Sequence, residues 1–294
     1  MIDRRTFGER LFDGINIAFM WFMILVMVYP LYYVIVASLS DPDLLLAKTG
    51  LLLKPVGFSF DAYKAVLNYP SIMLSARNTI IIVVLSLAIN MVLTCFGAYF
   101  LSRRGIMLRR FMMKLLTITM YFGGGLVPFY ILVKGLGLRN TFGAVILPYA
   151  ISTYNLIIMR SAFDEIPESL IEAAEIEGAN DLQVLWKIVI PVSKATMAVI
   201  ALYYLVTAWN SWLPAALFFD KRQLFPLQLV LREILISGSA NEMASASGVD
   251  TGSANMYQAV KYSTIIIATV PILCVYPFLQ RYFTKGVMIG AVKG

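Results

Sequence analysis

The side chains best suited to specific recognition lie in one acidic segment, Asp164 to Pro191, which reads DEIPESLIEAAEIEGANDLQVLWKIVIP. Seven carboxylates fall between Asp164 and Asp181, although the whole chain carries a formal net charge of +7. Carboxylates pair with arginine guanidinium groups in a defined geometry. An acidic helix face next to an apolar one is therefore suited to docking into a basic groove of another protein.

The first half of this segment has the pattern of a short helix. Asp164 is a suitable N-cap, and Pro167 falls in the first turn, where a missing N–H is tolerated. Apolar and acidic side chains then form two stripes at helical spacing, Leu170, Ile171 and Ala174 in one and Glu168, Glu172 and Glu175 in the other. Gly178 follows the last turn, where a left-handed residue commonly closes a helix.

The second half predicts another short helix. Asn180 or Asp181 caps it, and Pro191 ends it before the next apolar block. Its apolar residues recur at i, i+3, i+4 and i+7, as Leu182, Leu185, Trp186 and Val189. A helix pair lying on the membrane surface is the plainer alternative. However, such helices usually carry a basic polar face, and an acidic one is repelled by anionic lipid. Local physics thus favours docking to a protein.

Composition places the rest of the chain in a membrane. Of the 294 residues, 60% are hydrophobic and 14% are charged, against about 45–50% and about 25% in soluble domains. The chain has no histidine, and its cysteines, Cys95 and Cys274, both lie in apolar blocks. The sequence therefore predicts no catalytic nucleophile–base pair, no metal site and no cofactor bound by this chain. No compact basic patch with interleaved aromatics indicates nucleic-acid binding.

Six apolar blocks are long enough to cross a bilayer of about 30 Å. We place them at residues 15–37, 79–101, 112–133, 141–163, 196–218 and 262–283. Positive residues crowd the link between the second and third blocks, namely Arg103, Arg104, Arg109, Arg110 and Lys114. Positive charge in short loops marks the cytoplasmic side, so both termini and the acidic segment are expected there. The long segment 219–261 is then outside.

The predicted spans carry almost no charge, which argues against an ion-coupled secondary carrier, because such carriers usually keep ionisable groups at membrane depth. Several spans contain glycine or proline, notably Gly123–Gly125, Pro128, Pro148, Pro271 and Pro277. Ordinary kinks are the plainer interpretation, and free backbone groups beside a pathway are the alternative.

The acidic segment resembles a known motif. Glu172-Ala173-Ala174, then Gly178, then Ile188 and Pro191, is similar to the EAA loop of permeases in binding-protein-dependent ABC importers. Further similarity to the carbohydrate-type permeases, and to their LplC/YtcP-like branch, lies in residues 50–55, 60–63, 208–212 and 276–294. That branch is associated with oligosaccharides, including pectin- and alginate-derived ones. The resemblance covers essentially the whole chain and implies a type I ABC importer permease fold, in a single domain of six transmembrane helices in the bacterial inner membrane.

The resemblance also implies a division of labour. The chain has no Gly-x-x-x-x-Gly-Lys-Ser/Thr loop, so ATP and Mg are expected on separate ATPase subunits. The implied partners are a second, homologous permease, two ABC ATPase subunits and an extracytoplasmic solute-binding protein. The residues implied in ATPase coupling are Glu172, Ala173, Ala174, Glu175, Gly178, Asp181 and Pro191. The alternatives are an ion-coupled carrier, or a membrane scaffold that docks a cytoplasmic partner.

Candidate substrate contacts are aromatic and amide side chains in the fourth and fifth blocks, because sugars are bound by aromatic faces and hydrogen-bonding groups. They are Tyr154, Asn155, Tyr203, Tyr204, Trp209 and Asn210. Anchoring of Trp and Tyr rings at the membrane interface is the alternative. The middle of the outer segment, residues 237–255, is rich in Gly, Ser, Ala and Asn. It is interpreted either as a flexible loop or as a loop that meets the binding protein.

Overall fold

The computed structural model describes residues 7–48, 50–103, 105–236, 259–275 and 277. The chain divides into two compact units, one of Met1–Pro70 with Glu233–Thr269 and one of Ser71–Arg232 with Val270–Gly294. In the described parts, every regular element is a helix, and the sole β-type pairing is an isolated bridge between Ser40 and Phe58. The predicted all-α fold class is confirmed.

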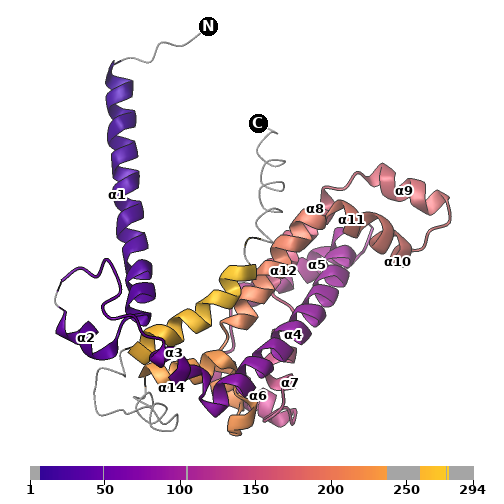
Figure 1. The fold of residues 1–294 in the computed structure, drawn as a ribbon. Coiled ribbons are helices and arrows are strands. Elements are labelled where there is room, and N and C mark those ends of the chain that lie inside the picture. Colours follow the sequence, from indigo (N-terminus) through magenta and orange to yellow (C-terminus); the bar gives the residue numbers. More distant parts are fainter. Residues whose placement is uncertain (1–6, 49, 104, 237–258, 276, 278–294) are drawn as a thin grey trace. The chain divides into compact units, whose positions relative to one another are not determined.

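The first unit contains one long helix and shorter elements around its end. They are α1 (Phe7–Ser38), α2 (Pro42–Ala47) and α3 (Asp61–Leu67) (Figure 1). An apolar helix, Ala259–Val275, also belongs to this unit up to Thr269. The Asp41 carboxylate caps α2 by accepting hydrogen bonds from the backbone N–H groups of Asp43 and Leu44, at 3.0 and 3.2 Å. A small core gathers Val36, Ala37, Leu45 and Leu52. Most side chains of α1 are exposed within this unit, as suits a helix made for an apolar environment.

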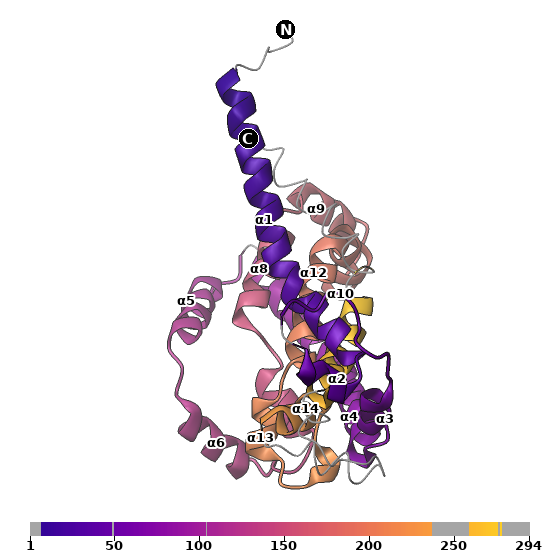
Figure 2. The same ribbon diagram turned by 60° about the vertical axis from the view of Figure 1, so that its left-hand side comes forward.

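The second unit holds most of the helices. They are α4 (Pro70–Ser102), α5 (Arg109–Tyr121), α6 (Leu126–Gly135), α7 (Gly143–Ile146), α8 (Thr153–Asp164), α9 (Glu168–Ile176), α10 (Asp181–Val184), α11 (Ile190–Val192), α12 (Lys194–Trp209), α13 (Leu213–Phe218) and the part of α14 (Leu227–Ile236) up to Arg232. Short 3₁₀ turns lie at Leu147–Tyr149 and Arg222–Leu224, and a π-helical turn lies at Leu185–Val189. In both views of this unit, α9 and α10 lie at one end and α6 and α13 at the other (Figures 1 and 2).

Two apolar cores stabilise these two ends. The core near α9 combines residues of α4, α8 and α12 with Ile171 of α9 and Leu185 of the π-helical turn. The core at the opposite end combines Ile82 of α4 with Val133 of α6 and Phe218 of α13. Because α4 contributes to both cores, this single helix connects the two ends of the unit.

Each predicted span corresponds to one or more helices. Some spans are a single continuous helix, and others are broken into shorter helices. The first two lie inside α1 and α4. The third is divided between α5 and α6, which meet at 115° across a break that ends at Gly125, whose φ is +83°. The run Gly123–Gly125 therefore produces a sharp break where a kink was the plainer interpretation, because glycine adopts backbone conformations that other residues avoid.

The later spans are also interrupted. The fourth comprises α7, the 3₁₀ turn and α8, and the fifth comprises α12 and α13. The sixth is helical at Ala259–Val275, and its last part lies largely outside the described residues. Two helices of the described chain are long and apolar enough to cross a bilayer, or up to four if each sharply bent pair is one crossing. The count of six spans stays a prediction.

Candidate functional site

The acidic segment forms the two short helices predicted for it, α9 and α10, and then continues through the π-helical turn into α11. Gly178 closes α9 with a φ of +85°, in the left-handed region that favours glycine. Asn180 caps α10 in a capping box with Gln183, in which each side chain accepts a hydrogen bond from the other residue's backbone N–H, at 2.9 and 3.0 Å. We call residues 168–192 the docking segment.

The N-cap predicted for the first helix is wrong. Asp164 is the last residue of α8, and Pro167 stands at the cap position of α9. The Asp164 carboxylate instead accepts hydrogen bonds from Nη2 of Arg109, at 3.0 and 3.1 Å, and pairs with Arg160 one turn before it in α8. Two guanidinium groups bind a carboxylate more strongly than a backbone N–H does, so the ion pairs determine where Asp164 lies.

The apolar stripes are only partly buried. Ile171, Leu185 and Val189 lie in the core, whereas Leu170, Leu182 and Trp186 are exposed. In the second helix, the buried face is thus centred on Leu185 and Val184 and excludes the predicted Leu182 and Trp186. The docking segment therefore presents large apolar side chains outward, including Ile176, which is 88% exposed. Exposed apolar groups beside carboxylates are typical of a surface that binds another protein.

The predicted coupling residues fall into two groups. Glu172 and Ala173 lie on the exposed face of α9, and within the described residues the Glu172 side chain has no ion pair or hydrogen bond. Ala174 is half-buried against the core, and its carbonyl accepts the backbone N–H of Ala179 at 2.9 Å. Pro191 lies within α11 and does not end it. The docking segment ends at Val192, and the chain then turns through 86° into α12.

Glu175 and Asp181 lie beside the end of α4, although 46% and 77% of their side-chain surface stays exposed. Glu175 forms an ion pair with Arg103, which follows the last residue of α4. The Tyr99 hydroxyl donates to Oδ1 of Asp181 at 3.1 Å, and Nη2 of Arg103 lies 4.0 Å from the same oxygen. The guanidinium also lies 5.6 Å from the centroid of the Tyr99 ring, a cation–π distance. We call Tyr99, Arg103, Glu175 and Asp181 the Arg103 cluster.

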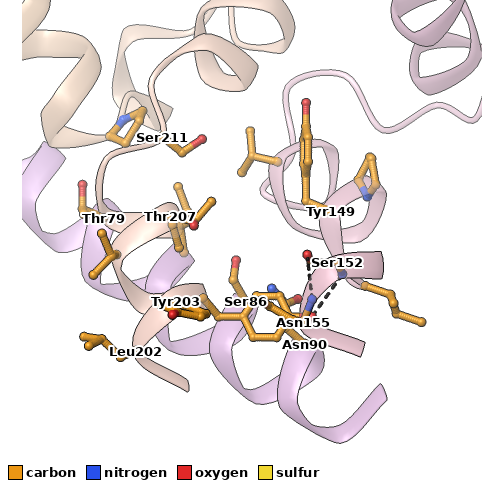
Figure 3. A pocket seen from close by; sticks show the side chains of 18 of the residues that line it. Thr79, Ser86, Asn90, Tyr149, Ser152, Asn155, Leu202, Tyr203, Thr207 and Ser211 are labelled. Atoms are coloured by element: carbon orange, nitrogen blue, oxygen red, sulfur yellow. Dashed lines mark hydrogen bonds between the residues drawn. The ribbon is translucent and has the colours of Figure 1, made fainter. Parts of the chain in front are cut away.

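A cavity of about 870 Å³ lies in the same unit, between α4, α8 and α12 (Figure 3). Its lining combines hydroxyl, amide and aromatic side chains with aliphatic ones such as Ile82, Ile151 and Leu202. The polar and aromatic lining residues are Thr79, Ser86, Asn90, Tyr149, Ser152, Tyr154, Asn155, Tyr203, Tyr204, Thr207 and Ser211. None of the described lining residues carries a charge. A cavity of this size and character fits a neutral or hydroxyl-rich ligand of several rings.

Hydrogen bonds fix the wall of this cavity. The Tyr204 hydroxyl lies 2.7 Å from Oγ1 of Thr94 and accepts the backbone N–H of Ser152 at 3.0 Å. Ser152 in turn caps α8, because its hydroxyl accepts the backbone N–H of Asn155 at 3.4 Å (Figure 3). The polar tip of Tyr204 is therefore used in positioning α8. By contrast, the Asn155 side chain is buried at the cavity and makes no hydrogen bond within the described residues.

Four of the six predicted substrate contacts meet at this cavity. They are Tyr154, Asn155, Tyr203 and Tyr204. Trp209 and Asn210 are absent from the lining, and the Asn210 amide donates to the Val206 carbonyl at 2.9 Å. The sequence prediction missed Thr79, Ser86 and Asn90, although small polar residues recurring along one apolar helix are a usable signal.

A second polar cluster joins the loop before α7 to the residues that follow α13. Asn140, whose φ is +59°, donates from Nδ2 to Asp220 at 2.8 Å and accepts the Asp220 backbone N–H at 2.7 Å. Arg139 donates to the same carboxylate at 2.7 Å. The hydrogen bond from Asn140 and the one from Arg139 together lower the pKa of Asp220.

Comparison with known proteins identifies the family of this chain. The family described as "binding-protein-dependent transport system inner membrane component" matches residues 90–289. The chain belongs to this family. The permease is 39% identical to the polygalacturonan/rhamnogalacturonan transport system permease protein YtcP of Bacillus subtilis strain 168, over 97% of its own length and 99% of the relative's. It is 38% identical to protein LplC of the same organism, over 98% and 97%.

Solved structures agree with this assignment. The permease superposes on a chain from a bacterial ABC transporter involved in the import of the acidic polysaccharide alginate, with a TM-score of 0.89 and 31% identity. The match covers 95% of the permease and 99% of that chain. A chain from a bacterial alginate ABC transporter in complex with a pentasaccharide-bound periplasmic protein matches with a TM-score of 0.60 and 14% identity, which shows the fold alone. The predicted ABC importer permease fold is confirmed.

Proposed function

We propose that this permease forms half of the translocation path for an oligosaccharide in an ATP-driven importer. It acts with a second permease, two ATPase subunits and an extracytoplasmic solute-binding protein. The proposal is carried by one observation, the presence of a sugar-sized, uncharged cavity and an exposed acidic docking segment along the same helical unit. The names of the relatives support a saccharide cargo.

The cavity chemistry suits a sugar. Sugar rings have apolar faces that stack on aromatic side chains and hydroxyls that bond amides and hydroxyls. Tyr154 and Tyr203 have ring centroids 6.4 Å apart at the cavity, and Asn155 adds an amide. Because no described lining residue is charged, we expect this chain to contact ring faces and hydroxyls. The carboxylates of an acidic sugar are then left to water or to the partner permease.

The docking segment is the part of this chain that contacts the ATPase subunit. On the cytoplasmic side, Glu172 pairs with a basic residue in a groove of the ATPase, and the small side chains of Ala173 and Ala174 allow close approach. Closure of the two ATPase subunits then moves two docking segments together and changes which side of the membrane the path opens to. Both termini are cytoplasmic in this arrangement.

The outer segment 219–261 is proposed to meet the binding protein. Its first part is ordered as the 3₁₀ turn Arg222–Leu224 and α14, so it is not wholly a loop. The Gly- and Ser-rich part predicted to reach the sugar, residues 237–255, lies outside the described residues.

A matched pair of asparagines tests the cargo path. We expect Asn155→Ala to lower oligosaccharide uptake about tenfold, equivalent to about 1.4 kcal/mol, in the reconstituted importer with its binding protein. Asn210→Ala, outside the cavity, should leave uptake unchanged. If neither change alters uptake, the cavity is not part of the translocation path. ATP hydrolysis measured against a panel of sugars on the binding protein then identifies the cargo.

A further inference from the structure

The Arg103 cluster connects the docking segment to α4. Its two carboxylates come from either side of the turn at Gly178. Glu175 lies in the last turn of α9, and Asp181 is the first residue of α10. Between them the chain reverses at Gly178. A single guanidinium therefore faces two carboxylates on opposite sides of the turn, and Tyr99 adds a hydrogen bond to one of them.

We propose that Arg103 is a positioning residue that holds the docking segment against the end of α4, so that movement of the segment is passed to the helix that lines the cavity. The inference rests on the proposed docking function. It assigns to Arg103 a coupling role that is separate from binding the ATPase.

Apolar contacts also hold α9 against this unit. Ile171 is the one buried residue of α9, and Ala174 is half-buried beside it. An apolar contact of this kind is non-directional, so it holds the helix close without fixing its orientation. A charged hydrogen bond is directional, and Arg103 provides one to Glu175, at the end of α9 that is nearest the turn. The Arg103 side chain is 24% exposed, whereas Glu175 and Asp181 are 46% and 77% exposed, so solvent screens the pair with Asp181 more than the pair with Glu175.

The helix that receives this movement is continuous. α4 runs unbroken from Pro70 to Ser102, and it presents Thr79, Ser86 and Asn90 to the cavity. Thr94, between the cavity and the cluster, contacts Tyr204 of α12. Nine residues of helix separate Asn90 from Tyr99, a distance of about 14 Å at about 1.5 Å per residue. A rigid helix of this length transmits a displacement at one end to side chains near the other.

Arg109 provides a matched control. Its side chain is also 24% exposed, and it also pairs with a carboxylate, but that carboxylate is Asp164 of α8 and not part of the docking segment. If any ion pair near this end sufficed for coupling, Arg103 and Arg109 would be equivalent. The proposal requires that they differ.

The test uses the complete importer with its ATPase subunits and loaded binding protein, and measures sugar transported per ATP hydrolysed. We expect Arg103→Gln to lower this ratio about tenfold, within the usual range of site-to-site coupling, while the ATPase still co-purifies. Arg103→Lys should be intermediate, because it keeps the charge without the forked donors. Arg109→Gln should leave the ratio unchanged.

Two results would overturn the inference. They are an unchanged ratio in Arg103→Gln and an equal loss in Arg109→Gln. Failure of the proposed function is distinguishable, because it appears as ATPase binding that survives Glu172→Lys. If Glu172→Lys releases the ATPase and Arg103→Gln leaves the ratio unchanged, the docking function stands and only the role of Arg103 falls.

Discussion

The hydroxyls of Thr94 and Tyr204 lie 2.7 Å apart and join α4 to α12 at the wall of the cavity. The same tyrosine oxygen accepts the N–H of Ser152 at the start of α8. One phenol thus connects three helices. Because Thr94 is fully buried, loss of the Tyr204 hydroxyl leaves the Thr94 hydroxyl without a partner in the interior.

Tyr204→Phe is therefore expected to lower the free energy of unfolding by about 1–3 kcal/mol, since it leaves the Thr94 hydroxyl and the Ser152 N–H without this partner. Thermal unfolding in detergent measures the effect. The neighbouring Tyr203→Phe is the control, because the Tyr203 hydroxyl makes no hydrogen bond within the described residues. Equal melting temperatures for the two variants would contradict the assigned role of Tyr204.

Local signals predicted the turn and the second cap of the docking segment, but not its first cap or the exposure of Leu182 and Trp186. Gly178 and the Asn180 cap were found because a left-handed closure and a capping box depend on residues a few positions apart. Partners distant in sequence were not found. The pairing of Arg103 with Glu175 joins residues 72 positions apart, and such pairs depend on how the helices pack.

The cavity shows the same limit. Residue type selected Tyr154, Asn155 and Tyr203, which line the cavity, but also Trp209 and Asn210, which lie outside the lining. Chemical suitability does not show which way a side chain points. That depends on the rotation of α12 against α4, which packing determines.

Gly97→Ala should destabilise the permease. A methyl group at Gly97 would lie 2.7 Å from Cδ1 of Leu156, which is buried in α8. The overlap forces α4 and α8 apart or moves the leucine, at a cost of about 1–3 kcal/mol. Gly135→Ala in α6 has open space and should be neutral or stabilising, because alanine favours helix. Thermal unfolding compares them, and a Gly97→Ala variant as stable as Gly135→Ala would contradict the close approach.

Asp220 predicts a pH dependence of stability. Its pKa is lowered in the folded state by hydrogen bonds from Asn140 and Arg139, so its contribution is complete above the unfolded pKa of about 3.9. The contribution is lost as pH falls through the lower, folded pKa. Melting temperatures measured from neutral pH to about pH 3 should therefore fall less steeply in Asp220→Asn than in the parent. Parallel pH profiles would show that the carboxylate is not held by these partners.

The turn at Gly178 should tolerate asparagine better than valine. The φ of +85° disfavours L side chains, and asparagine adopts this region more readily than β-branched residues do. Space is not the limit, because no atom lies within 4 Å of an added Cβ. We expect Gly178→Val to weaken co-purification of the ATPase and Gly178→Asn to preserve most of it. Equal losses would indicate that the side chain, and not the backbone, determines the effect.

Retention of the ATPase by the affinity-purified permease, compared between Glu172→Lys and Glu165→Lys, tests the central claim most directly. Both positions are exposed and undergo the same change of charge, but Glu165 follows α8 and lies outside the docking segment. The account predicts that Glu172→Lys loses the ATPase and ATP-dependent uptake while Glu165→Lys keeps both. Full retention of the ATPase and of ATP-dependent uptake by Glu172→Lys would contradict it.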